Sequence, residues 1–329
     1  MKIGFPLGLS KGGPSIFLER LKNSYKINNL VKTSFFFDPT ADLLIFSSKV
    51  RNLWGKPHIM RLDGIYYGSH TNSTQESKIK NTPIIEGIKN AKGLVYQSKF
   101  SKFLINNFFS VDANIPSTII NNGVDLEKFN PKGYNLREKL GIKSSELVFI
   151  TSANFRPLKR LDDMINSFIE YKRIVNKKIY LIIIGNLNKK YNNLPKEIIF
   201  TGTIKHILLP NWYRTADICL HFAIRENCPN SVVEALATRL PVLCTNLGEG
   251  TEELIKLTHG GIVVDADKKS DLEKYNKLNP PSPDQKKIIE GIDTIVKNKN
   301  KISENINTKL IDINFVSQKY YDFIKKLEL

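Results

Sequence analysis

The stretch RENCPNSVVEALATRLPVLCTNLGEGTEEL covers residues 225–254 and holds two glutamates, Glu226 and Glu234, separated by seven residues. Glu234 stands inside an otherwise apolar run, VVEALA, although a carboxylate is rarely buried without a partner. Short apolar runs at 218–222 and 241–244 predict strands on either side of this segment. The order strand, loop, helix, strand predicts one unit of a parallel α/β sheet.

Short apolar runs of the same kind recur along the chain, each followed by a loop and a segment with helical periodicity. The expected strands are 2–5, 43–46, 58–62, 93–97, 117–121, 148–152, 179–184, 198–201, 218–222, 241–244 and 261–264. From Leu161 to Ile169, apolar residues follow the i, i+3, i+4, i+7, i+8 spacing of an amphipathic helix that packs on a sheet. Strands that alternate with such helices predict βαβ units and parallel sheets.

A polar segment with proline and glycine, residues 123–146, interrupts this alternation. We therefore expect two doubly wound α/β domains, 1–140 and 141–329, that face each other across a cleft. The lysine-rich segment 268–301 is expected to be a loop plus an exposed helix. A last amphipathic helix, about 313–327, could pack back on the first domain. Because ligands of such sheets bind beyond the carboxyl ends of the strands, the cleft is the expected site.

The composition limits the classes of partner. Lysine and arginine number 49 against 32 acidic residues, which gives a net charge of +17 and favours anionic partners, although the lysines are dispersed enough to be a compositional bias. Three cysteines without a CxxC motif and five histidines without an HxH or HExxH motif predict neither disulfides nor a metal site, and a reducing compartment. The chain opens on a predicted strand and lacks an apolar run of about 20 residues. A cytoplasmic protein without a signal peptide, soluble or peripheral to a membrane, is expected.

The helix that carries Glu234 is the first candidate site. Pro229 suits the first turn of a helix, and the neighbours of Glu234 one turn away include Asn230 and Ser231, so its face is small and polar. A carboxylate there could accept paired hydrogen bonds from a diol such as ribose. The start of the helix offers free N–H groups and a positive dipole end to a phosphate. The alternative is that Glu234 merely caps or solvates the helix.

Two loops that follow strands could bind a diphosphate. Arg156 and Lys159 lie in the loop after strand 148–152, where arginine binds phosphate in a bidentate manner and lysine as a point charge. They could equally form the charged first turn of the next helix. Gly12 and Gly13, after the first strand, permit a close backbone approach to a ligand ahead of a helix. That sequence is neither G-x-G-x-x-G nor Walker A.

Two further strand ends carry candidate residues. Asp63 follows an apolar strand and could orient or deprotonate an acceptor hydroxyl, or it could simply begin an Asp-Gly turn. In FTGTIKH, Thr203 follows a strand end, where backbone groups could hydrogen-bond the edge of a base.

Together these motifs resemble the retaining nucleotide-sugar glycosyltransferases of family 4, most strongly between residues 147 and 255. The resemblance is carried by the glutamate pair in ENCPNSVVEALA, by PVLCTNLGEGTEELI, NFRPLKRLDDMI, GTI, LPNWYRTADICL and NNGVDLEKF, and by the glycines of the first loop. It implies the GT-B fold, in which two Rossmann-like domains face each other across a cleft. The first domain would bind the acceptor and the second the nucleotide sugar.

The resemblance also implies roles for the candidate residues. Glu234 would bind the ribose hydroxyls, and Glu226 the hydroxyls of the donor sugar. Lys159, with Arg156, would stabilise the diphosphate leaving group. Asn230 and Ser231 would offer backbone amides to the sugar and the phosphate. Gly12 and Gly13 of the first loop would approach the diphosphate, and Thr203 and Ile204 would lie near the base. No enzyme nucleophile and no metal are implied.

The expected function is retaining transfer of a hexose from a UDP- or GDP-linked donor to a saccharide or lipid-linked acceptor, in polysaccharide, lipopolysaccharide or glycoconjugate synthesis. The nucleotide sugar is a substrate, and no cofactor is expected. An anionic membrane surface would suit the positive charge. One alternative is a non-catalytic nucleotide-sugar-binding protein of the same fold. Another is a basic nucleic-acid-binding protein, which only the charge supports because the usual motifs are absent; no nucleic-acid partner is expected.

Overall fold

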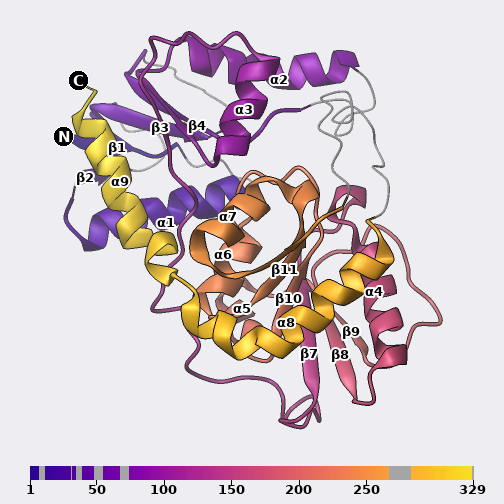
Figure 1. Ribbon diagram of the computed structural model, residues 1–329. Helices are drawn as coiled ribbons and strands as arrows, with labels where there is room; N and C mark the ends of the chain where they lie inside the picture. The colour runs from indigo at the N-terminus through magenta and orange to yellow at the C-terminus, as the bar shows by residue number, and fades with distance from the viewer. Residues whose placement is uncertain are drawn as a thin grey trace.

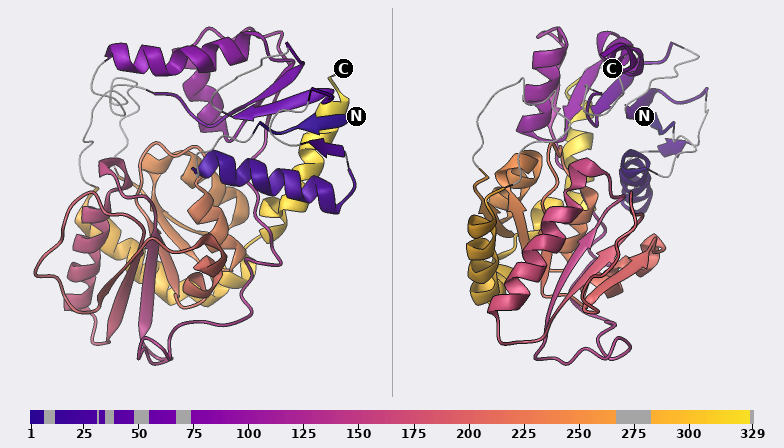
Figure 2. Two further views of the ribbon diagram at one scale, coloured as in Figure 1. Left: turned by 180° about the vertical axis from the view of Figure 1, so that it is seen from behind. Right: turned by 90° about the vertical axis from the view of Figure 1, so that its right-hand side faces the viewer.

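The computed structural model describes residues 1–6, 12–30, 32–34, 39–47, 55–66, 74–266 and 283–327. Within these residues the strands form two parallel six-stranded sheets with helices packed on them (Figures 1 and 2). The prediction of two parallel α/β sheets is confirmed. None of the helices described has the length and hydrophobicity needed to cross a membrane.

The first sheet has the strand order β2-β1-β3-β4-β5-β6. Its strands are β1 (Lys2–Gly4), β2 (Lys32–Ser34), β3 (Leu43–Ser47), β4 (His58–Leu62), β5 (Gly93–Tyr96) and β6 (Ser117–Ile119), and its helices are α1 (Gly13–Ile27), α2 (Thr74–Lys89) and α3 (Lys99–Phe108). The sequence did not predict β2, a polar edge strand of three residues. The other strands coincide with predicted apolar runs to within about two residues.

The second sheet has the order β12-β11-β10-β7-β8-β9. Its strands are β7 (Leu147–Ser152), β8 (Ile179–Ile184), β9 (Ile198–Gly202), β10 (Ile218–His221), β11 (Val242–Thr245) and β12 (Gly261–Val264). Its helices are α4 (Leu161–Ile174), α5 (Leu209–Tyr213), α6 (Asn230–Ala237), α7 (Gly250–Thr258) and α8 (Gln285–Asn305). Every residue of β8 is buried, which is why its sequence IYLIII is continuously apolar, as in a parallel strand covered on both faces.

Helix α4 buries the apolar residues whose spacing predicted an amphipathic helix after residue 160. Leu161, Met164 and Phe168 are buried on one face, against the sheet and α8. Acidic residues stand in its first turn and basic residues in its last, which complements the helix dipole.

The C-terminal segment crosses from the second sheet to the first. Helix α8 packs its buried residues Ile288, Ile292 and Ile295 into the core of the second sheet, so the prediction of an exposed helix is wrong: its apolar period outweighs its lysine content. The loop expected before it lies mostly outside the described residues. Helix α9 (Ile313–Lys325) lies beside α1 of the first half of the chain (Figures 1 and 2). Its buried residues share a hydrophobic core with α1 and β1.

Candidate functional site

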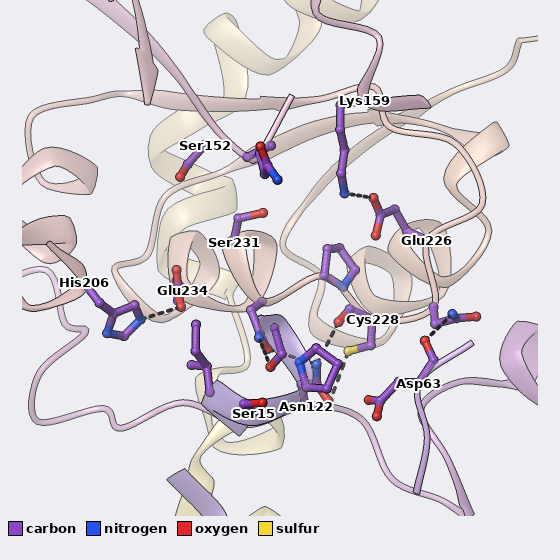
Figure 3. Close-up of a pocket in the computed structure, with 18 of the residues that line it drawn as sticks. Ser15, Asp63, Asn122, Ser152, Lys159, His206, Glu226, Cys228, Ser231 and Glu234 are labelled. Atoms are coloured by element: carbon purple, nitrogen blue, oxygen red, sulfur yellow. Dashed lines mark hydrogen bonds and ion pairs between the residues drawn. The ribbon is translucent and has the colours of Figure 1, made fainter. Parts of the chain in front are cut away.

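A cavity of about 1060 Å³ lies between the two sheets, lined by segments that follow the carboxyl ends of strands in both of them (Figure 3). The predicted site residues that line it are Gly13, Asp63, Arg156, Lys159, Thr203, Ile204, Glu226, Asn230, Ser231 and Glu234. Gly12 stands just outside as the N-cap of α1. Residues from strand ends far apart in the sequence thus meet at one place, as expected for ligand sites of open α/β sheets.

Two helices begin at this cavity, one from each half of the chain. Helix α1 begins at Gly13 and α6 at Asn230, and neither has a hydrogen bond from a capping side chain. The first N–H groups of a helix have no acceptor within the helix, and its N-terminus carries partial positive charge. The Nδ2 atom of Asn230 donates to the carbonyl oxygen of Gly13 at 3.0 Å, which holds the two helix starts together. The arrangement suits an anion between them.

Lys159 and Glu226 form an ion pair on the wall of the cavity (Figure 3). Lys159 ends a short 3₁₀ turn, Pro157–Lys159, after β7, and Glu226 follows β10. Burial by itself would raise the pKa of Glu226, but the charge of Lys159, the hydrogen bond that Lys159 donates to Glu226, and the charge of Arg156 lower that pKa. The site therefore contains an ionised carboxylate beside a fixed cation.

His221, the last residue of β10, lies behind this pair. Its side chain is buried, and its Nε2 atom has no hydrogen-bond partner among the described residues. Burial lowers the pKa of His221 from its ordinary value of 6.5 to about 4, with the charge of Glu226 opposing the shift. At neutral pH the ring is uncharged.

The buried His221 makes stability depend on pH. Between pH 6.5 and 4 the unfolded chain binds a proton at this residue that the folded chain does not, so stability falls with decreasing pH there. The contribution should be fully present above pH 6.5, and about 2 kcal/mol of it should be lost at pH 5. Urea unfolding at pH 7.5 and 5 measures this loss. His221→Gln should remove it, whereas the exposed His259→Asn should keep it; an unchanged loss in His221→Gln would assign the acid sensitivity elsewhere.

Glu234 is only 4% exposed, so it does not simply solvate the helix, and it does not cap α6. Its Oε1 atom accepts hydrogen bonds from Arg20 of α1 and, at 3.0 Å, lies beside Nε2 of His206. The hydroxyl of Tyr213 is 3.4 Å from Oε2. Burial alone would raise the pKa of Glu234, but the hydrogen bond from His206 and the charge of Arg20 lower it. This carboxylate is therefore ionised and faces the cavity from one side.

Asp63 lies in the cavity wall contributed by the first sheet, as predicted from its place after β4. Its Oδ1 atom pairs with the buried Arg61 and accepts a hydrogen bond of 2.5 Å from Gln97. Its carbonyl oxygen accepts from Asn227 of the second half at 2.9 Å. The carboxylate is thus held in place, which a residue serving only as a turn would not require.

Asn122 joins the two halves beneath the cavity. Its Oδ1 atom accepts from Arg61 at 2.6 Å, while its Nδ2 atom donates to the carbonyl oxygen of Cys228 at 2.8 Å and to Asn230 at 3.0 Å. Both asparagines and Arg61 line the cavity. This network fixes the start of α6 against the first sheet.

The sequence analysis missed Arg20, Arg61, Asn122, His206 and His221. The sequence offers a clue to two of them. Arg20 is seven residues after Gly13, two turns along the same face of the predicted helix, and His206 is the last residue of the quoted motif FTGTIKH. Across the described part of the chain, no group of three or more His, Cys, Asp or Glu side chains is placed to hold a metal ion.

Residues 134–279 match the family model described as glycosyl transferases group 1. The chain carries a glycosyl transferases group 1 domain. This domain includes the Lys159–Glu226 pair, Glu234 and the start of α6, which form one wall of the cavity.

Two relatives match part of the chain in sequence. The chain is 32% identical over 141 residues to alpha-monoglucosyldiacylglycerol synthase of Acholeplasma laidlawii, covering 38% of this chain and 35% of the relative. It is 31% identical over 162 residues to the UDP-Gal:alpha-D-GlcNAc-diphosphoundecaprenol alpha-1,3-galactosyltransferase of Escherichia coli, covering 45% and 41%. The matched part thus spans less than half the length of either relative.

The structure resembles Anabaena HepE, solved in complex with UDP and glucose, with a TM-score of 0.75, 16% sequence identity, and coverage of 99% of this chain and 100% of that one. At that identity the likeness concerns the fold alone. The two facing sheets form the GT-B fold, as predicted.

Proposed function

We propose that this protein is a retaining glycosyltransferase of family 4 that transfers a hexose from a UDP- or GDP-linked donor without a metal ion. The observation that carries the proposal is the cavity in which two helix starts meet a fixed cation, Lys159, and two ionised glutamates, Glu226 and Glu234. These groups match the parts of a nucleotide sugar: a diphosphate, a sugar and a ribose. Residues 1–140 are assigned to acceptor binding and 141–329 to donor binding.

The diphosphate would lie between the starts of α1 and α6. There Gly12 and Gly13 permit a close approach, and the first backbone amides of α6, at Asn230 and Ser231, provide donors. Departure of the nucleoside diphosphate places negative charge on its phosphate oxygens. Preorganised dipoles and cations stabilise such developing charge without reorganising during the reaction.

Lys159 supplies the fixed cation of this scheme, and Arg156 a second one. Lys159 pairs with Glu226. When the donor binds, a phosphate oxygen can take the place of Glu226 beside Lys159, and Glu226 can accept hydrogen bonds from hydroxyls of the donor sugar. Arg156 lies exposed in the same cavity wall and can reach the same phosphates.

The nucleoside would extend toward Glu234. Its ionised carboxylate can accept from both ribose hydroxyls, and the backbone around Thr203 and Ile204 lies on the same side of the cavity for the base. In the retaining scheme, the acceptor hydroxyl attacks from the face that the leaving group vacates, so no enzyme nucleophile is required. Asp63, held by Arg61 on the opposite wall, is the candidate to orient that hydroxyl.

The proposed acceptor is a saccharide or a lipid-linked saccharide of polysaccharide, lipopolysaccharide or glycolipid synthesis. The names of the two relatives, a glycolipid synthase and a transferase acting on a diphosphoundecaprenol-linked sugar, support this choice. The net charge of +17 would favour the anionic cytoplasmic surface of a membrane, where each basic residue near the surface contributes about 1 kcal/mol.

Calorimetric binding of UDP, GDP and ADP in EDTA, at low and high salt, tests the proposal. One diphosphate should bind selectively with little salt dependence, and its hexose-linked form should be turned over with EDTA present. A nucleic-acid-binding protein would instead prefer none of them and would lose about 10³-fold or more in nucleic-acid affinity over a fourfold rise in salt. Selective binding without turnover on any acceptor would contradict the enzyme and favour the non-catalytic alternative.

A further inference from the structure

Arg20 connects the first half of the chain to the carboxylate proposed to bind ribose. It lies in the middle of α1, its side chain is only 10% exposed, and it is not among the residues that line the cavity. Its Nη2 atom donates to Oε1 of Glu234, and its Nη1 atom donates to the carbonyl oxygen of Gly123 at 3.3 Å. The guanidinium thus reaches Glu234 from behind the cavity wall.

We infer that Arg20 is a positioning residue for the donor: it fixes the carboxylate of Glu234 so that the second carboxylate oxygen is presented to the ribose. The inference rests on the proposed function, because it concerns the ribose of the same nucleotide sugar. It places control of the ribose site partly in α1, outside the glycosyl transferases group 1 domain.

The two oxygens of Glu234 have different surroundings. Oε1 receives Arg20 and His206, whereas the hydroxyl of Tyr213 is 3.4 Å from Oε2, a long contact for an O–H donor. Each carboxylate oxygen has about two lone-pair sites. The protein therefore uses one oxygen as the anchor and leaves acceptor capacity on the other for ribose hydroxyls.

His206 cannot anchor the carboxylate alone. Its Nε2 atom is 2.9 Å from Nη2 of Arg20 and 3.0 Å from Oε1 of Glu234. Arginine only donates hydrogen bonds and an ionised carboxylate only accepts them, so one ring nitrogen can satisfy only one of these neighbours at a time. The guanidinium is the partner that binds Glu234 in either tautomer of the ring.

Removing Arg20 should therefore affect the ribose specifically. The carboxylate of Glu234 would lose the bond from α1 that fixes its orientation, and His206 would be left as its neighbour at Oε1. A carboxylate that can rotate is a poorer acceptor for two hydroxyls in a fixed geometry. The base and the diphosphate, which contact other residues, should bind as before.

The experiment compares UDP with 2′,3′-dideoxy-UDP by calorimetry, with the GDP and ADP pairs in parallel, on full-length wild type, Arg20→Met and Arg20→Gln. Wild type should prefer the ribonucleotide by about 10- to 100-fold, the range expected for hydrogen bonds to a charged group. Both variants should reduce that preference to about twofold or less and leave the dideoxy affinity unchanged. Lys26→Met, which removes an exposed charge from the same helix, should behave as wild type.

Equal weakening of both ligands in the Arg20 variants would overturn the inference, because it would show a general structural role. Should the single variants not fold, the pair Arg20→Met/Glu234→Gln is compared with Glu234→Gln alone. Equal ribose preference supports action through Glu234, and a further drop in that preference overturns it.

The wild-type result separates this inference from the proposed function. Wild type that binds UDP, GDP or ADP without any ribose preference overturns the inference and leaves the proposed transferase standing. Wild type that binds none of them overturns both.

Discussion

The double variant Lys159→Met/Glu226→Gln is expected to lower glycosyl transfer by about 10²- to 10³-fold, the usual effect of removing one group that stabilises developing charge. Its folding free energy should remain close to that of wild type. The two side chains pair with each other and are only 17% and 15% exposed. Replacing both charges with neutral groups of similar size removes the attraction and the desolvation cost together.

The single variant Lys159→Met should behave differently. It leaves the carboxylate of Glu226 in a largely buried position without its cation, and breaking such a pair costs about 3 kcal/mol. A loss of activity in the single variant could therefore come from unfolding. The double variant separates the chemical role of the pair from its structural role, with turnover of the identified donor and urea unfolding as the two measurements.

An exposed ion pair of the same domain provides the matched control. Nζ of Lys189 lies 2.8 Å from Oδ2 of Asp162, and the two side chains are 51% and 56% exposed. Lys189→Met/Asp162→Asn should change stability by less than about 1 kcal/mol and leave transfer unchanged. Wild-type turnover in the Lys159→Met/Glu226→Gln variant would remove both residues from the proposed mechanism.

The strands could be predicted from the sequence wherever both faces of a strand are buried. The run IYLIII of β8 is apolar throughout because helices cover both faces of the sheet. The strand β2 shows the opposite case: KTS at the edge of the first sheet buries too little to leave a pattern. A helix was predicted in the α8 region, but it was predicted to be exposed because of its many lysines. The structure buries a stripe of isoleucines on one face of α8.

The site could be predicted only where its residues share a local motif. Glu226, Asn230 and Glu234 are close in sequence, so strand, loop and helix place them together. Arg20 lies 214 positions from Glu234, and Asn122 lies 108 positions from Asn230. Such partners depend on how the two sheets face each other, which no local spacing encodes. The sequence therefore predicts the cavity residues of the local motif, such as Glu226 and Glu234, better than it predicts their distant hydrogen-bond partners, such as Arg20 and Asn122.

Gly185→Ala is expected to destabilise the fold by about 3 kcal/mol or more and to deform the cavity. Gly185 follows β8 and has φ of +128°, a backbone conformation that residues other than glycine rarely adopt. A Cβ atom at this position would lie 1.8 Å from the carbonyl oxygen of Ala153. Ala153 and Asn186 line the cavity on either side of this contact. The backbone must move to relieve the clash, so nucleotide binding should weaken along with stability in urea unfolding.

Gly202→Ala is the matched control, since the backbone N–H of Gly185 donates to the carbonyl oxygen of Gly202 at 2.9 Å in the neighbouring strand. Gly202 has φ of +67°, in the left-handed region, and among the described residues no heavy atom other than those of its chain neighbours lies within 4 Å of an added Cβ. Its substitution should cost only about 1 kcal/mol, the conformational penalty alone. If both variants lost the same free energy of unfolding, about 1 kcal/mol, the backbone at Gly185 would be able to relax away from Ala153. The shape of the cavity would then not depend on a glycine at that strand end.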